Sequence, residues 1–140
     1  MTDSDFGVAG RVVGRAFMLS SLNARTLHAG ADVLDTLCTI PDVRGALLEV
    51  RRALAPSGRF YFVEDGLAEE ARVERWQHRL NSTNQRLLGG CNLTRPIATV
   101  IEQAGFEIER LEKSYMKDAP TFAGFLYRGV ARRIRQNEIR

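Results

Sequence analysis

The chain has 140 residues, 44% of them hydrophobic and 26% charged, with a formal net charge of +3. This length and composition suit one globular domain with its own core, and they exclude a disordered or fibrous chain. Because the N-terminus is acidic and no apolar run approaches the ~20 residues of a membrane span, we expect no secretory signal, no membrane span and a cytoplasmic location.

The first 30 residues carry the weakest pattern. Their apolar residues permit one amphipathic helix over about Val8–Leu27, although Gly10 and Gly14 each cost about 1 kcal/mol in a helix interior. We therefore expect a helical or poorly ordered segment. These glycines lack a G-x-G core and follow no strand, so they do not predict a nucleotide-binding loop.

Residues 32–65 predict a strand, a crossover helix and a second strand. The apolar run Val33–Ile40 predicts the first strand. The helical spacing of apolar residues over Val43–Leu54 predicts the helix, and Asp42 precedes it as a good N-cap. The second strand, Arg59–Glu64, follows at once. Two strands joined by such a crossover are parallel neighbours with a right-handed connection.

The carboxyl ends of these two strands are the predicted location of the chemistry. In open α/β sheets, ligands bind beyond those ends. The first end holds Leu37, Cys38 and Thr39, and the second holds Glu64.

Helix-forming residues dominate the next segment, up to residue 95. Acidic residues favour a helix start near Leu67, and the spacing of Val73, Trp76 and Leu80 places them on one apolar stripe. A second short turn or helix is predicted over Ser82–Leu88, before two glycines.

The last third of the chain predicts one helix and two strands. The helix runs from Ile97 to Ala104, with Thr94 as its cap and Gly105 as its left-handed terminator. The predicted strands are Phe106–Leu111 and Phe122–Val130, separated by a loop over Lys113–Pro120. Because a loop joins them, we expect the last strand to pair antiparallel with a neighbour.

Several motifs in this order resemble one known family. They are Asp32-Val33-Leu34, Leu37 to Asp42, the run Glu49 to Arg59 with its Leu-x-Pro-x-Gly ending, Val63-Glu64-Asp65, Ala104-Gly105-Phe106 and Tyr127 to Ala131. Together they resemble the C-terminal half of class I, Rossmann-like S-adenosylmethionine-dependent methyltransferases. The segments Arg75 to Leu80 and Gly89 to Arg95 are similar to the bacterial type-11 methyltransferases and the thiol S-methyltransferases.

The resemblance implies an α/β fold with strands four to seven of a Rossmann-like methyltransferase sheet, the last strand antiparallel and helices on its faces. It implies three parts: an N-terminal segment 1–30, a methyltransferase-like domain 31–133 and a basic tail 134–140. It also implies S-adenosylmethionine as the cofactor, with Leu37, Cys38 and Thr39 beside its methyl-bearing end. The family's glycine-rich loop and ribose-binding acid precede this half and are not found here, so the chain reads as a truncated form.

Two candidate catalytic residues and one thiol each have a second interpretation. Glu64 is predicted to orient the acceptor or act as a base, or else to be a surface carboxylate paired with Arg59 or Arg95. His78 is a candidate base or an ordinary half-exposed helical histidine. Cys38 lines the cofactor pocket or is a small buried thiol.

The candidate acceptor-binding residues are Trp76, Cys91, Asn92 and Arg95. Trp76 is predicted to pack in the core or a lid, or to form an aromatic wall for an apolar acceptor. The segment around Asn92 carries several types of polar side chain that packing in a core would not require, which suggests a binding role. A turn at the start of a helix that satisfies its own backbone would also explain them. Cys38 and Cys91 are expected to be free thiols, and no metal site is predicted.

Two functions follow. The first is methyl transfer from S-adenosylmethionine to a small-molecule thiol or amine acceptor. The second is a non-catalytic half-domain that forms a homodimer, or binds a partner, through the open edge of its sheet. The arginine-rich C-terminus lacks interleaved aromatics and a binding module, so no nucleic-acid partner is expected.

Overall fold

The computed structural model describes residues 30–34, 37–87 and 89–135. The predicted N-terminal helix and residues 136–140 of the basic tail lie outside these ranges. In chain order the elements are β1 (Gly30–Leu34), α2 (Val43–Ala53), β2 (Arg59–Asp65), α3 (Ala71–Leu87), α4 (Ile97–Gln103), β3 (Phe106–Tyr115) and β4 (Phe125–Arg133).

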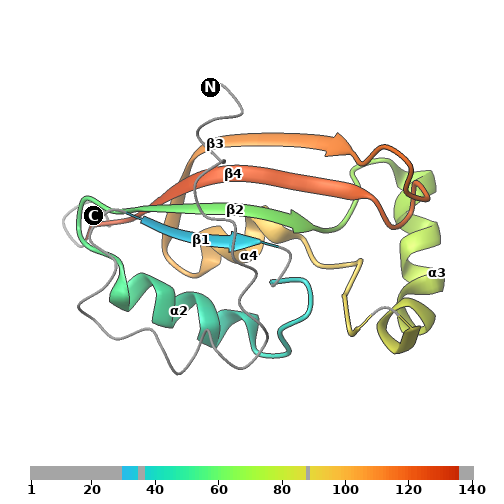
Figure 1. Cartoon of the computed structure of the whole chain (residues 1–140), viewed down its shortest axis with the longest axis horizontal. Coiled ribbons are helices and arrows are strands. Elements are labelled where there is room, and N and C mark those ends of the chain that lie inside the picture. Colours follow the sequence, from blue (N-terminus) through green and yellow to red (C-terminus); the bar gives the residue numbers. More distant parts are fainter. Residues whose placement is uncertain (1–29, 35–36, 88, 136–140) are drawn as a thin grey trace.

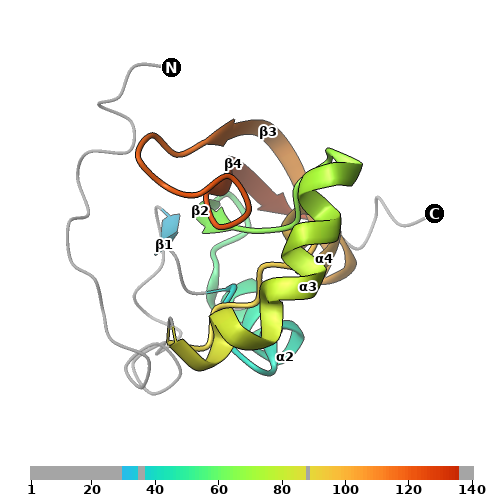
Figure 2. The ribbon, with the colours of Figure 1, turned by 90° about the vertical axis from the view of Figure 1, so that its right-hand side faces the viewer.

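Within the described residues, the strands form a four-stranded sheet in the order β1-β2-β4-β3. β1 and β2 are parallel, whereas β4 runs antiparallel to both of its neighbours, so the predicted parallel pair and the predicted antiparallel last strand are confirmed. Helices α2 and α4 lie against one face of this sheet, and α3 stands at the end where β1 and β2 finish (Figure 1). The view along the sheet shows β1 at one edge and β3 at the other (Figure 2).

The core lies between the sheet and helices α2 and α4. Phe60, Phe62 and Glu64 alternate along β2 on the buried face, each 0% exposed. Leu47 of α2 and Ile101 of α4 pack into the same cluster. Burial of this apolar area supplies the main driving force for folding of the unit.

The first strand begins and ends earlier than the prediction over Val33–Ile40. β1 covers Gly30–Leu34, and Leu37–Thr39 forms a turn after it. Leu37 and Cys38 are 2% and 1% exposed. The burial of this turn explains why its residues are apolar. An apolar run cannot distinguish a buried turn from the strand that precedes it.

Helix α2 has the predicted boundaries and cap. The Asp42 carboxylate accepts a hydrogen bond from the Gly45 N–H at 2.9 Å, and Arg51 and Arg52 occupy the last turn. The N-cap bond satisfies one of the four N–H groups that lack a partner within the helix.

We expect Asp42→Ala to lower the free energy of unfolding by about 1 kcal/mol, because it removes this capping bond at an exposed helix end. Urea unfolding followed by circular dichroism measures the change. Asp42→Asn keeps a capping oxygen and should lose less than half as much. Equal losses in the two variants would contradict a capping role.

Helix α3 differs from its prediction in two ways. It starts at Ala71 instead of near Leu67, and it continues without a break to Leu87, so the separate element over Ser82–Leu88 is wrong. Gln77 and Asn84 are buried on the same face as Val73, at helical spacing. Two buried polar residues interrupt the apolar stripe, which is why the pattern suggested two shorter pieces.

The last two strands are displaced from their predicted bounds. β3 continues to Tyr115 instead of ending at Leu111, so the loop that joins the strands is residues 116–124 and not Lys113–Pro120. β4 begins at Phe125, three residues later than predicted. The outer part of β3 is mostly exposed, so it offers no alternating apolar pattern to detect.

Candidate functional site

Hydrogen bonds from three residues hold the loop that follows β1, residues 37–40, called here the post-β1 loop. The Cys38 N–H donates to Glu64 Oε2 at 3.2 Å, and the Cys38 carbonyl accepts from the Asn92 N–H at 2.8 Å. Arg95 Nη1 donates to the carbonyl oxygens of Leu37 and of Ile40, the latter at 2.8 Å. The predicted residues from the two strand ends and from the segment 91–95 therefore do meet.

Glu64 is fully buried, with 0% exposure. The interpretation as a surface carboxylate paired with Arg59 or Arg95 is therefore wrong. Arg59 Nε donates to Glu109 at 2.5 Å, while Arg95 binds the backbone of the post-β1 loop. A buried carboxylate that accepts a backbone N–H fixes that backbone, because leaving either group unsatisfied is costly.

The segment 91–95 forms a turn that is held by bonds within it and by bonds to other segments, among them the bond from the Leu93 N–H to Asn81 Oδ1 at 2.8 Å. Asn92 Oδ1 accepts from the Thr94 N–H at 3.0 Å and from the Thr94 hydroxyl at 2.8 Å. Thr94 therefore does not cap α4, whose N-cap is Pro96 with no side-chain hydrogen bond. Gly105, however, ends α4 with φ +87°, as predicted.

The two cysteines lie in one small buried cluster. Cys38, Cys91 and Leu93 form it, with Phe122 and Ala123 packed against them. Within the described ranges neither cysteine is part of a disulfide, as expected. Phe122 and Ala123 belong to the 116–124 loop, so this cluster connects the post-β1 loop to the connection between β3 and β4.

The other two predicted site residues lie on α3. Trp76 is 49% exposed, and the guanidinium of Arg79 sits 5.7 Å from the centre of its ring. The His78 side chain is 58% exposed, with Nε2 3.7 Å from the Glu74 carboxylate one turn away. These contacts of Trp76 and His78 are with residues of α3 itself, so the structure groups the two residues separately from Cys38, Glu64 and Arg95.

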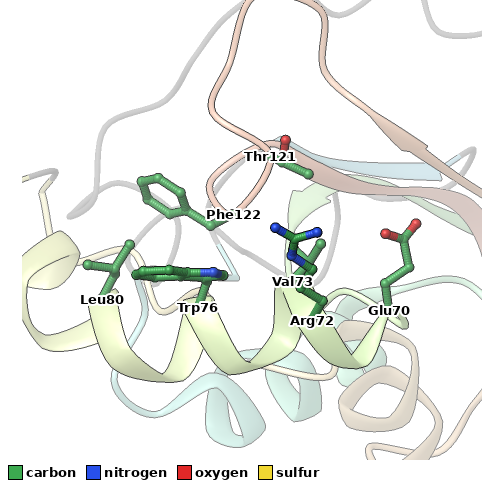
Figure 3. A pocket seen from close by; sticks show the side chains of 7 residues that line it. All are labelled: Glu70, Arg72, Val73, Trp76, Leu80, Thr121 and Phe122. Carbon is green, nitrogen blue, oxygen red and sulfur yellow. The ribbon is translucent and has the colours of Figure 1, made fainter.

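A groove runs between α3 and the 116–124 loop and is called here the α3 groove. Its wider part has a volume of about 580 Å³, and its narrower part about 270 Å³. Leu80 and Phe122 line both parts. Figure 3 shows Trp76 and Leu80 on the helix facing Phe122 on the loop, with Arg72 and Glu70 toward the start of the helix.

Buried amides attach α3 to its surroundings. Gln77 accepts from the Ala68 N–H at 2.8 Å and donates to the Gly66 carbonyl at 2.9 Å. Asn84 donates to the Cys91 carbonyl at 3.1 Å. The sequence analysis missed both amides. The available signal was that the amides of Gln77 and Asn84 recur at helical spacing on the face that also buries Val73.

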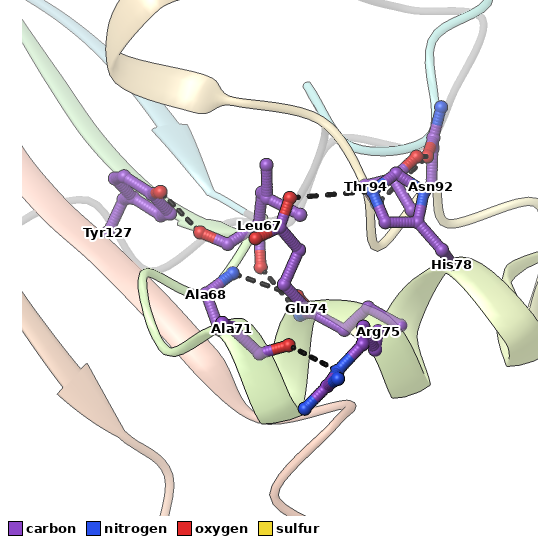
Figure 4. Close-up of polar contacts among 11 residues, drawn as sticks. Leu67, Ala68, Ala71, Glu74, Arg75, His78, Asn92, Thr94 and Tyr127 are labelled. Atoms are coloured by element: carbon purple, nitrogen blue, oxygen red, sulfur yellow. Dashed lines mark hydrogen bonds and ion pairs between the residues drawn. The ribbon is translucent and has the colours of Figure 1, made fainter.

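Tyr127 fixes the segment between β2 and α3. It is 5% exposed, and its hydroxyl donates to the Leu67 carbonyl (Figure 4). Burial, followed by the negative charge of Glu69, raises the pKa of Tyr127 above its usual 10.0. The folded protein therefore favours the neutral phenol more strongly than the unfolded chain does.

The raised pKa of Tyr127 predicts a loss of stability in alkali. Because the folded pKa lies above 10.0, its contribution is complete below that pH and is lost as the pH rises through the folded value. We expect the free energy of unfolding of the wild type to fall faster above about pH 10 than that of Tyr127→Phe. Urea unfolding across this range measures both slopes, and parallel slopes would contradict the assignment.

Among residues 30–34, 37–87 and 89–135, no group of three His, Cys, Asp or Glu side chains is arranged to hold a metal ion. Within the same ranges, the structure contains no helix with the length and apolar character needed to cross a membrane.

Known proteins with similar sequences cover part of this chain. No protein-family model matches it. Over 77 residues, or 54% of the chain, it is 38% identical to thiol S-methyltransferase TMT1A of Homo sapiens and 35% identical to thiol S-methyltransferase TMT1B of Rattus norvegicus. These matches cover 32% of each relative, so the chain spans about a third of the length of the curated proteins it matches.

Solved structures show the same fold. An S-adenosylmethionine-dependent methyltransferase of Methanosarcina mazei superposes with a TM-score of 0.56 at 16% identity, over 80% of this chain and 65% of its own. One from Mesorhizobium loti gives 0.51 at 18% identity, over 79% and 67%. The chain is thus similar in sequence, over about half its length, to two thiol S-methyltransferases, and over most of its length it has the fold of S-adenosylmethionine-dependent methyltransferases.

Proposed function

We propose that this chain provides the acceptor side of a methyl transfer from S-adenosylmethionine to a small thiol or amine. The observation that carries the proposal is the post-β1 loop, which is fixed at the carboxyl end of a parallel strand by Glu64, Asn92 and Arg95. Ligands of open α/β sheets bind beyond this edge. The similarity of half the chain to two thiol S-methyltransferases supports the thiol as acceptor.

The described residues fit one side of the cofactor. The post-β1 loop has a fixed backbone, since Leu37, Cys38 and Ile40 all use their carbonyls in bonds to Asn92 or Arg95. The Leu37 and Cys38 side chains are buried, so we propose that the loop meets the cofactor through its backbone and Thr39. The glycine-rich loop of the methyltransferase family is not among the described residues, so the proposal covers only the side of the cofactor that faces the post-β1 loop.

Most of the rate in such a reaction comes from positioning, because S-adenosylmethionine supplies a methyl group that its sulfonium already activates. In this chain, Glu64 is a positioning residue: it is buried and holds the Cys38 N–H. The transfer of an acceptor proton to Glu64 or His78 stays a prediction. Trp76 and Cys91 are proposed to border the acceptor from α3 and from the buried cluster.

A second candidate function rests on the edge of the sheet. β1 pairs only with β2 among the described strands, so its other side is an open edge within that part of the chain. An open strand edge offers unpaired N–H and C=O groups to another strand. In this alternative the chain is a non-catalytic half-domain that pairs with a second copy of itself.

Calorimetric titration of the full chain with S-adenosylhomocysteine tests the proposal. Saturable binding in the micromolar range, weakened in Arg95→Gln but not in Arg86→Gln, supports the cofactor site beside the post-β1 loop. Titration with ATP controls for attraction of anions to basic surfaces. Absence of S-adenosylhomocysteine binding together with a dimeric mass in light scattering would overturn the proposal in favour of the half-domain.

A further inference from the structure

We infer that Cys38 and Cys91 form a redox pair, two thiols that a peroxide converts into one disulfide within the folded chain. They are the two cysteines of the sequence and come from segments far apart in it. The structure nevertheless places both in one buried cluster, of which Leu93 is the third member. Cys38 belongs to the post-β1 loop and Cys91 to the segment 91–95. A bond between them would therefore join the two segments that meet at the candidate site.

One backbone hydrogen bond fixes the separation of the two cysteines. The Cys38 carbonyl accepts from the N–H of Asn92, the residue directly after Cys91, at 2.8 Å. In a trans peptide this N–H lies on the same side as the preceding Cα, so a nearly linear bond places the Cα atoms of Cys38 and Cys91 about 4–6.5 Å apart. Disulfides usually connect Cα atoms about 4.4–6.8 Å apart. The backbone therefore already meets the distance that a disulfide requires.

The side chains of the two cysteines point into the same cluster. Cys38 is 1% exposed and Cys91 is 8% exposed, and Phe122 and Ala123 of the 116–124 loop pack against the cluster that both form. Two cysteines whose Cβ atoms point apart cannot be joined unless the backbone moves. Because these two share one cluster, a disulfide needs rotation about side-chain bonds and no rearrangement of the chain.

Hydrogen bonds hold the backbone of both cysteines in place. The Cys38 N–H donates to Glu64 at 3.2 Å, and the Cys91 carbonyl accepts from the Asn84 side chain at 3.1 Å. Arg95 donates to two further carbonyl oxygens of the post-β1 loop and so connects it to the segment 91–95. Two groups held as neighbours have a high effective concentration for each other. This arrangement favours a disulfide within the chain over one between two chains.

The oxidation balances with hydrogen peroxide as the oxidant. Cys91 is the more exposed of the two, so its thiolate attacks the O–O bond and becomes a sulfenic acid, while the departing hydroxide takes up a proton and leaves as water. The Cys38 thiolate then attacks the Cys91 sulfur and displaces a second water. Two thiols and one peroxide thus give one disulfide and two waters. Because both thiols are buried, the reaction requires a local opening of the cluster and should be slower than in the unfolded chain.

Packing alone is the other role that two buried cysteines can have, since free cysteine behaves as a small hydrophobic residue. That role needs only the volume of the side chains. A disulfide forced onto a cluster of that kind would strain it and lower the stability of the folded chain. The two roles therefore predict opposite effects of oxidation on stability.

Peroxide treatment of the full chain, followed by alkylation in urea and measurement of the intact mass, tests the pair. The expected product carries no alkyl label and is lighter than the reduced chain by two hydrogen atoms. Its peptide map without reductant should join Cys38 to Cys91, and dithiothreitol should restore both thiols. Cys91→Ser cannot form this product. A disulfide between two chains, sulfinic acids alone, or thiols that stay reduced under conditions that oxidise the urea-unfolded chain would each overturn the inference.

Urea unfolding of the oxidised chain supplies the second measurement. A disulfide that fits the fold restricts the unfolded chain, so the oxidised chain should unfold at a higher urea concentration than the reduced chain. In the Cys91→Ser control, peroxide should not raise the midpoint. A lower midpoint in the oxidised wild type would show that the bond strains the fold, and it would overturn the inference.

The redox pair does not depend on the proposed methyl transfer. A Cys38–Cys91 bond in a chain that does not bind S-adenosylhomocysteine would retain the pair and overturn the proposed function. Binding of S-adenosylhomocysteine by a chain that forms no such bond would overturn the pair alone.

Discussion

Replacing Glu64 with alanine should lower the free energy of unfolding by about 3 kcal/mol. The substitution leaves the Cys38 N–H without its acceptor in a fully buried position and opens a cavity beside Phe62 on the inner face of the sheet. An unsatisfied buried donor costs about 1–3 kcal/mol, and a cavity adds to that cost. Urea unfolding monitored by circular dichroism measures the loss.

Glu64→Gln is the matched control for that prediction. The glutamine keeps the volume of the side chain and still offers an oxygen to the Cys38 N–H, so it should lose no more than about half as much stability. Glu102→Ala, an exposed change on α4, should stay within about 0.5 kcal/mol of the wild type. If Glu64→Ala also remained within that limit, Glu64 would not be the residue that holds the post-β1 loop.

Gln77→Ala should cost a similar amount, about 3 kcal/mol. Gln77 is 0% exposed and makes two buried hydrogen bonds, with the Ala68 N–H and the Gly66 carbonyl. Both backbone groups would lose their partner at once, and a cavity would form under α3. These bonds connect α3 to the segment after β2, so their loss should also let α3 shift relative to the 116–124 loop. A change in the emission of Trp76 would report that shift.

The control for Gln77 lies two turns further along the same helix. Gln85 is exposed, so Gln85→Ala should change stability by less than about 0.5 kcal/mol and leave the Trp76 emission unaltered. Similar losses in Gln77→Ala and Gln85→Ala would mean that helix propensity, rather than the buried amide, accounts for the effect.

The sequence predicted the elements that obey a simple period and an end signal. Helix α2 has its apolar spacing, its Asp42 cap and a terminating Pro-Ser-Gly, and its bounds agree with the structure. Strand β2 alternates buried residues and was also located correctly. Local signals suffice where each residue's preference agrees with its tertiary environment.

The sequence could not predict the details that depend on distant contacts. The turn Leu37–Thr39 is held in the interior by Glu64 and Arg95, which come from other elements. Its apolar residues were therefore predicted to be part of a strand. Asn92 was predicted to be a site residue, but its bonds to Thr94 became evident only from the folded turn. The α3 groove needed the 116–124 loop opposite the helix, and no local pattern indicates that pairing.

The most direct test of the central claim follows the backbone amides of the full chain by nitrogen-15 NMR during titration with S-adenosylhomocysteine. If the post-β1 loop borders the cofactor, the amides of Cys38, Thr39 and Asn92 should shift saturably and with one common affinity, while those of the exposed Gln85 and Glu102 stay in place. A titration that leaves the amides of residues 37–40 unmoved would contradict the account.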